Sequence, residues 1–409
     1  MGSYCETYLD EIFVWTSKSY VDEIMLSLFC EDDRRIRVLT DKGQKSNSYE
    51  YACKAGHMAD RLDAMGFTIT RAIKDYERLR KDEIEMIESW DYDFSDTAVN
   101  FLRTWDFKTW SQHLKALVKK GAQQWSVEEF EDNPDITRIY EERDLTFGGY
   151  FSDARYYIRA LLTIFPRRDE LVLNYTDLVD GGYYSEDEEL CDDARLDWSE
   201  THPIFGPIVL LTEGRADTRV LKNGMSKLHP HMSSLYSFLD FEGYRVEGGA
   251  SILMKTVNAF AAARINTRMI AIFDNDPAGI HAHQQLLKKS LPANIKVMIL
   301  PNIPIAQSYP TRGPQGSIKM DVNGMAGSIE MYLGKEALSD EQGVLRPVVW
   351  GGFHDKQNTY HGVIDNKAAV HNAFLKKISK AKCAKEAQEK FPELNKILQQ
   401  VFSVFSQPV

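Results

Sequence analysis

Short, almost continuous apolar runs that alternate with amphipathic helical stretches are the feature that most constrains the fold of this chain. The runs read "PIVLLTEG", "RMIAIFDND" and "IKVMILPN", and helical patterns such as "ADTRVLKNGMSKL" and "AGIHAHQQLLKKSL" separate them. Strands that are apolar on both sides must be covered on both faces, which is typical of a parallel sheet between two layers of helices. We therefore predict an α/β unit, a Rossmann-like parallel sheet flanked by helices, over about residues 205–335.

The N-terminal part of the sequence has a different pattern. Residues 1 to about 50 alternate apolar and polar residues, as in "TYLDEIFVWTS", and this alternation predicts strands. From about 51 to 175 apolar residues recur at helical spacing, and the acidic stretch "DLVDGGYYSEDEELCDDARLDWSE" follows. The pattern predicts four parts: a strand-then-helix region (1–178), an acidic linker (179–204), the α/β unit (205–335) and a C-terminal helical extension (336–409).

Composition excludes several classes of protein. The net charge is −11, so a broad basic face for nucleic acid is not expected, although bound cations can offset negative charge locally. The five cysteines are scattered without a CxxC pair, which argues against a zinc module and a disulfide framework and favours a reducing cytoplasm. The apolar runs are too short to span a bilayer, and the start lacks the basic segment of a signal peptide. We expect a cytoplasmic protein without a membrane partner.

Acidic residues stand at the ends of the predicted parallel strands. Glu213 closes the first strand, Asp274 and Asp276 close the third, and Asp217 lies one helical turn after Glu213. The second strand ends near Asp240 and Glu242. Ligands of open parallel sheets bind at this edge, and converging carboxylates repel one another unless protons or cations are present. The sequence therefore predicts a Mg²⁺ or Mn²⁺ site.

A second interpretation applies to the last of these acids. Asp276 stands directly before Pro277 and a helical pattern, so it is also a candidate helix N-cap with proline at the first helical position. The metal interpretation depends on the combination of Glu213 with the D-x-D on another strand of the same sheet.

These residues carry a resemblance to a known family. "LLTEGRADTRVL" followed by "AIFDNDPAG" resembles the Toprim domain of topoisomerases, primases and OLD-family nucleases, over about residues 207–335. The EGxxD form is more similar to the OLD-type nucleases. "GSIEMYLG" resembles their late acidic motif, with Glu330 as the acid, and Lys367 in "GVIDNKAAV" is similar to a late basic residue. The start "MGSYCETYLDEIFVW" and the helical zone resemble a HEPN/Toprim-associated region of bacterial defence proteins.

The resemblance implies a metal-dependent endonuclease that cleaves DNA or RNA as the effector of an antiphage defence system. Asp274 and Asp276 would hold one ion, and Glu213, Asp217 and Glu330 would hold a second or act as general base, so that the two ions assist phosphodiester hydrolysis. Lys319 or Lys367 would stabilise charge on the phosphate, the alternative being a solvated surface lysine. The resemblance thus implies two Mg²⁺ or Mn²⁺ ions.

The sequence also departs from the patterns of the related families. OLD proteins carry an ATPase, but this chain has no GxxxxGK[ST] motif, so an ATPase partner would act in trans. The helical zone lacks the closely spaced Arg and His of HEPN ribonucleases, which favours a scaffold or a homodimer element. The alternative function is a Toprim module that regulates or binds nucleotides without cleavage, working with a partner ATPase.

Overall fold

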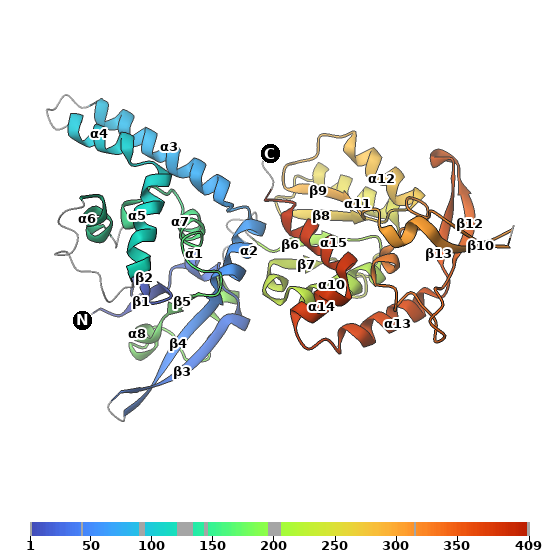
Figure 1. The fold of residues 1–409 in the computed structure, drawn as a ribbon, viewed down its shortest axis with the longest axis horizontal. Helices are drawn as coiled ribbons and strands as arrows, with labels where there is room; N and C mark the ends of the chain where they lie inside the picture. Colours follow the sequence, from blue (N-terminus) through green and yellow to red (C-terminus); the bar gives the residue numbers. More distant parts are fainter. Residues whose placement is uncertain are drawn as a thin grey trace. The chain divides into compact units, whose positions relative to one another are not determined.

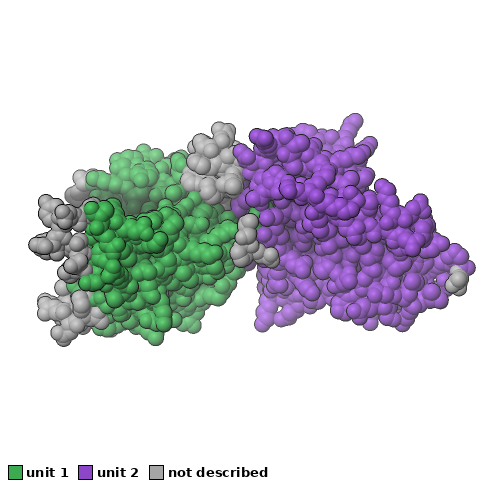
Figure 2. Space-filling view, turned by 90° about the horizontal axis from the view of Figure 1, so that it is seen from above, with its two compact units in different colours: residues 1–197, 405–409 green, residues 198–404 purple. Residues whose placement is uncertain are grey.

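The computed structural model describes residues 2–41, 44–89, 95–120, 134–142, 146–194, 206–314 and 316–406. The chain divides into two compact units, coloured separately in Figure 2. The first unit comprises residues 1–197 with 405–409, and the second comprises residues 198–404.

A five-stranded antiparallel sheet forms one layer of the N-terminal unit, as the period-two pattern predicts. Its strand order is β2-β1-β5-β4-β3, and every neighbouring pair is antiparallel. The strands are β1 (Tyr4–Leu9), β2 (Ile12–Lys18), β3 (Arg34–Asp41), β4 (Gln44–Lys54) and β5 (Glu170–Asn174). The buried positions of β1, β2 and β5 alternate, so one face of the sheet packs on the core.

The longer helices of this unit lie between β4 and β5 in the chain (Figure 1), and the short helix α1 (Glu23–Leu26) precedes β3. The longer helices are α2 (Ala55–Met65), α3 (Ile69–Glu88), α4 (Ser95–Thr104), α5 (Phe107–Lys120), α6 (Pro134–Glu141) and α7 (Ala154–Leu161). Helix α2 ends at Gly66 in the left-handed conformation, and Asp153 caps the start of α7. The fully buried Trp105 and Trp110 lie within this helical layer.

The described residues of the predicted acidic linker pack on the N-terminal unit. Helix α8 (Thr176–Asp180) already spans the expected boundary at 178. Beyond it, Tyr184 accepts a hydrogen bond from Val21 N–H, Glu186 accepts one from the Tyr49 hydroxyl, and Cys191 is buried. These contacts explain why the unit extends to residue 197. The remainder of the expected linker, residues 195–204, lies outside the described residues.

The C-terminal unit contains the predicted parallel sheet. Its order is β7-β6-β8-β9, and all three neighbouring pairs are parallel. The strands are β6 (Ile208–Leu211), β7 (Tyr236–Phe238), β8 (Met269–Phe273) and β9 (Ile295–Ile299). All five residues of β8 are buried, which is the burial that the near-continuous apolar run predicts.

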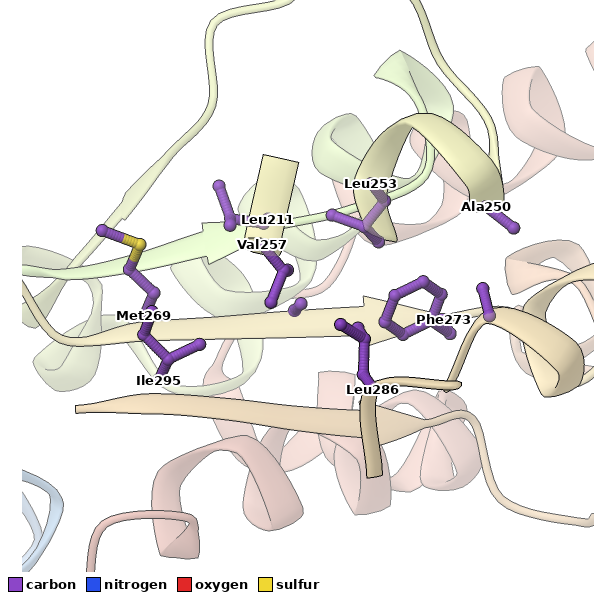
Figure 3. Close-up of a cluster of buried hydrophobic side chains, with 10 residues drawn as sticks. Leu211, Ala250, Leu253, Val257, Met269, Phe273, Leu286 and Ile295 are labelled. Carbon is purple, nitrogen blue, oxygen red and sulfur yellow. The ribbon is translucent and has the colours of Figure 1, made fainter. Parts of the chain in front are cut away.

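Helices cover both faces of this sheet. On one face, α11 (Ala250–Ala262) and α12 (Pro277–Leu287) pack on alternate residues of β6 and β8, and Figure 3 shows Leu286 of α12 near Phe273 of β8. On the other face, Tyr236 of β7 contacts Phe402 of α15 (Pro392–Ser403). Helix α10 (Arg215–Leu228) packs against α13 (Lys367–Ile378), α14 (Ala384–Lys390) and α15. The last three helices agree with the predicted helical tail.

The expected helical extension differs from the structure over its first part. A second four-stranded sheet, in the order β11-β10-β12-β13, precedes the helices. Its strands are β10 (Tyr309–Gly313), β11 (Gly316–Met320), β12 (Val348–His354) and β13 (Thr359–Ile364). The segments "VVWGGFH" and "TYHGVI" are rich in β-branched and aromatic residues, and a bulge between Trp350 and Phe353 accommodates the two glycines. The region after residue 335 is therefore mixed, with strands before helices.

Among the described residues, no helix combines the length and the apolar character needed to cross a membrane.

Candidate functional site

Two of the predicted carboxylates meet at the carboxyl edge of the parallel sheet. Strands β6 and β8 are neighbours, with Leu211 paired to Ala271, so the residues that follow them emerge at the same edge. The Asp274 backbone N–H donates a hydrogen bond of 3.0 Å to Glu213 Oε1. This hydrogen bond therefore joins the loop after β8 to the acid that follows β6.

Asp276 is the N-cap of α12. Its Oδ1 accepts a 2.8 Å hydrogen bond from Gly279 N–H, and Pro277 occupies the first turn, so the capping interpretation of this residue is confirmed. Its other carboxylate oxygen lies 3.5 Å from Nδ1 of His361 on β13. The cap and the histidine hold this buried side chain in one orientation.

Gly279 allows the turn after β8 to close tightly. A Cβ atom at this position would lie 2.1 Å from the Asp274 carbonyl oxygen and 3.0 Å from Glu213 Oε1. Only glycine at this position therefore lets the backbone at the start of α12 lie this close to Asp274 and Glu213.

A backbone bridge brings the late acidic motif to the same edge. Asn275 N–H donates to the Gly327 carbonyl at 2.8 Å, and Gly327 N–H donates back to the Asn275 carbonyl at 3.0 Å. The 3-10 turn η8 (Ile329–Tyr332) follows directly and carries Glu330. The middle residue of the D-x-D therefore fixes the position of Glu330.

Glu330 lies in a polar pocket and is only 2% exposed. Its Oε2 lies 3.1 Å from Lys367 Nζ and accepts a 2.5 Å hydrogen bond from the Ser328 hydroxyl. Its Oε1 lies 2.8 Å from His371 Nε2. Lys367 and His371 stand one turn apart at the start of α13, so a single helix face supplies both partners.

Three acids of this group hold their protons unusually tightly. Burial, followed by the charges of Asp276 and Asp217, raises the pKa of Glu213 to about 8. Burial and the charge of Glu330 raise the pKa of Asp217 to about 7. Burial together with the surrounding carboxylates raises the pKa of Asp274 well above its ordinary value. The site therefore concentrates more negative charge than its own cations neutralise.

The pKa values of Glu330 and Lys367 are shifted so that both side chains favour their charged forms. Burial alone would raise the pKa of Glu330, but His371, the Lys367 charge and Ser328 together hold it at about 2. Burial would lower the pKa of Lys367, but the charges of Glu330 and Asp274 raise it. Lys367 is thus held as an ammonium ion that faces the carboxylates.

The donor atoms of this group suit a divalent cation, but the side chains are not arranged for coordination of a metal ion. Its donors are carboxylate oxygens, the ligands that Mg²⁺ and Mn²⁺ prefer, and the raised pKa values indicate a deficit of positive charge. Within the described ranges, however, no group of three or more His, Cys, Asp or Glu side chains is arranged so that it could hold a metal ion. Binding would therefore require rotation of these side chains.

The structure brings the six predicted site residues within electrostatic range of one another: Glu213, Asp217, Asp274, Asp276, Glu330 and Lys367. Of the two lysines considered, only Lys367 lies with the acids, because Lys319 is exposed on β11.

Asp240 and Glu242 line a neighbouring cavity, and Asp240 Oδ1 accepts hydrogen bonds from its own loop.

Sequence reasoning missed three residues of the site. His371 lies four residues after Lys367, and this helical spacing is a signal that could have identified it. Ser328 stands inside the "GSIEMYLG" stretch, two residues before its acid. His361 has no such signal, because it reaches Asp276 from the second sheet.

Comparison with known proteins bears on the N-terminal unit. Residues 1–196 match the family model described as HEPN/Toprim N-terminal domain 1, and the match ends where this unit ends. It supports a HEPN/Toprim type of family, which suggests a nuclease-related role for the chain. The match does not extend to the carboxylates of the C-terminal unit. No curated protein and no solved structure matches the chain.

Proposed function

We propose that this chain is a metal-dependent nuclease whose active site is the carboxylate group at the edge of the β7-β6-β8-β9 sheet. The observation that carries the proposal is the pairing of Glu213 with the D-x-D, since Asp274 N–H donates to Glu213 Oε1 at 3.0 Å. The raised pKa values of Glu213 and Asp217, at about 8 and 7, support a site that needs added positive charge.

In this proposal the C-terminal unit has a Toprim fold, in line with the parallel sheet and the motif spacing. Its acids would hold one or two Mg²⁺ or Mn²⁺ ions; they are Glu213, Asp217, Asp274, Asp276 and Glu330. Bound divalent ions supply activation of a water molecule and stabilisation of the leaving oxygen in phosphodiester cleavage.

The chain's own residues perform the remaining tasks. Lys367 keeps its proton, because Glu330 and Asp274 surround it, and its ammonium group is suited to contact a phosphate oxygen. Whichever of Glu213, Asp217 and Glu330 does not bind an ion is the general base in this proposal. His371 and Ser328 hold the Glu330 carboxylate in place. Asp276 anchors the start of α12 beside the site.

The biological role that we propose is that of an effector in an antiphage defence system. The match of residues 1–196 to a HEPN/Toprim N-terminal domain supports this assignment. An ATPase partner acting in trans and a homodimer formed through the N-terminal unit belong to the same proposal.

One observation favours a second candidate function. The described side chains do not form a group ready to hold a metal ion, as expected for a module that regulates or binds nucleotides without cleaving them. Such a module would bind a nucleotide yet leave polymeric nucleic acid intact.

A cleavage assay separates the two functions. The purified chain, alone and with the products of neighbouring genes, is incubated with Mg²⁺ or Mn²⁺ and plasmid, single-stranded DNA or tRNA. We expect cleavage by the wild type and none by Asp274→Ala or Glu213→Ala. Glu336→Ala is the matched control, because Glu336 is an exposed carboxylate paired with Lys377. Absence of wild-type cleavage in every condition would overturn the nuclease assignment.

A further inference from the structure

A cavity of about 790 Å³ opens beside the carboxylate site, between the exposed face of α10, the end of β7 and the start of α13. We call it the α10 cavity. Three cations of α10 line it: Arg215, Arg219 and Lys222. His371, which contacts Glu330 on one side, also lines this cavity. The cavity therefore adjoins the proposed active site through His371.

The three cations of the α10 cavity form one wall. They stand at i, i+4 and i+7, so they lie on the same face of the helix, and all three are exposed. Among the residues that the structure describes, no carboxylate pairs with any of them. Although the net charge of the chain is −11, these three unpaired cations make this side of the cavity locally positive.

The residues that line the cavity at the end of β7 have different chemistry. The half-buried ring of Phe238 lines the cavity at the end of β7, and the exposed carboxylates of Asp240 and Glu242 follow it. An aromatic ring is a surface on which a base stacks, and carboxylates accept hydrogen bonds from the amino groups of bases. The α10 residues of the cavity thus suit a phosphate, and its β7 residues suit a base.

We propose that the α10 cavity binds one unpaired nucleotide of the substrate strand, next to the site of cleavage. Its phosphate contacts Arg215, Arg219 and Lys222, and its base lies against Phe238 with its amino group towards Asp240 or Glu242. The volume is within the range of pockets that enclose small ligands. In a duplex the base-pairing edges are occupied by the complementary strand, so this arrangement selects single-stranded nucleic acid. The inference rests on the proposed nuclease function and names the substrate class of that site.

Fluorescence anisotropy tests this proposal independently of cleavage. A short labelled oligonucleotide, as single-stranded DNA, single-stranded RNA or either annealed to its complement, is titrated with the full chain in EDTA. The wild type is expected to bind a single strand at least tenfold more tightly than the duplex. Arg219→Ala/Lys222→Ala is expected to weaken binding at least tenfold. Its slope of log affinity against log salt should be smaller by about 0.7 for each phosphate group that the variant no longer neutralises.

The matched control removes two other exposed lysines of the same unit, in Lys227→Ala/Lys255→Ala, neither of which lines the cavity. It is expected to bind like the wild type. Equal binding by Arg219→Ala/Lys222→Ala and the wild type would overturn the proposal even if the wild type cleaves nucleic acid. The proposal would also be overturned if the wild type bound the duplex as tightly as the single strand, or if it bound neither. Loss of single-strand binding in this variant, with no cleavage by the wild type, would support the cavity assignment and reject the nuclease.

Discussion

Replacing Glu213 by Gln is expected to stabilise the metal-free protein at alkaline pH. Glutamine keeps an oxygen that accepts the hydrogen bond from Asp274 N–H, and it removes the carboxyl group whose pKa is raised to about 8. Below about pH 4.5 the Glu213 carboxyl is protonated in both the folded and the unfolded chain. As the pH rises from 4.5 towards 8, the unfolded chain releases this proton while the folded chain keeps it, so the wild type loses stability over this window.

The size of the effect follows from the pKa difference. The interval between the ordinary 4.5 and about 8, at about 1.36 kcal/mol for each pKa unit, sets an upper limit of about 5 kcal/mol. Glu213 is half-buried and shares its repulsion with Asp217 and Asp274, so we expect about 2 kcal/mol at pH 8.5. For a unit of this size the gain corresponds to a rise in Tm of about 4–8 °C.

Thermal unfolding followed by circular dichroism in EDTA, at pH 5 and pH 8.5, measures this difference. The control variant is Glu336→Gln, which removes an exposed carboxylate whose pKa is lowered by its hydrogen bond with Lys377. We expect Glu213→Gln to raise Tm at pH 8.5 much more than at pH 5, and the control to give no gain at either pH. An unchanged or lower Tm for Glu213→Gln at pH 8.5 would refute the electrostatic reasoning about this site.

Three further predictions follow from the same site. Glu330→Gln is expected to lower the free energy of unfolding by about 3 kcal/mol at pH 7, measured by urea unfolding, because it removes the buried carboxylate that contacts Lys367 and His371. A stabilised variant would contradict the pKa of about 2. Gly279→Ala is expected to lower the free energy of unfolding by about 2 kcal/mol or more in the same urea measurement, because its Cβ would lie 2.1 Å from the Asp274 carbonyl oxygen. The control Gly352→Ala, whose Cβ would have no atom within 4 Å, should leave this free energy nearly unchanged. Mg²⁺ at about 100 times its Kd is expected to stabilise the wild type by about 2.7 kcal/mol, and to stabilise Glu213→Gln far less; equal gains in the two proteins would place the ion elsewhere.

The parallel sheet and its acidic edge could be predicted because their signals are local. The run "MIAIF" is apolar at every position, and β8 is buried at every position. Glu213 and Asp274 end neighbouring parallel strands, so their proximity follows from the topology alone.

Other parts of the site depend on contacts that no local pattern encodes. Glu330 reaches the sheet edge through the bridge between Asn275 and Gly327, and His361 arrives from β13. The strands β12 and β13 were not predicted, because two glycines interrupt the alternation of "VVWGGFH" where the bulge forms. The acidic stretch after residue 178 has the composition of a solvated linker, yet Tyr184, Glu186 and Cys191 pack on the N-terminal unit.

Direct measurement of Mn²⁺ binding tests the central claim that the acids at this sheet edge hold divalent cations. Free Mn²⁺ is followed by electron paramagnetic resonance as the protein is titrated, with the wild type, Asp274→Asn and Glu336→Gln compared at pH 8. We predict that the wild type and Glu336→Gln bind one or two ions and that Asp274→Asn loses at least one of them. Equal Mn²⁺ binding by the wild type and Asp274→Asn, or none by either, would contradict the claim.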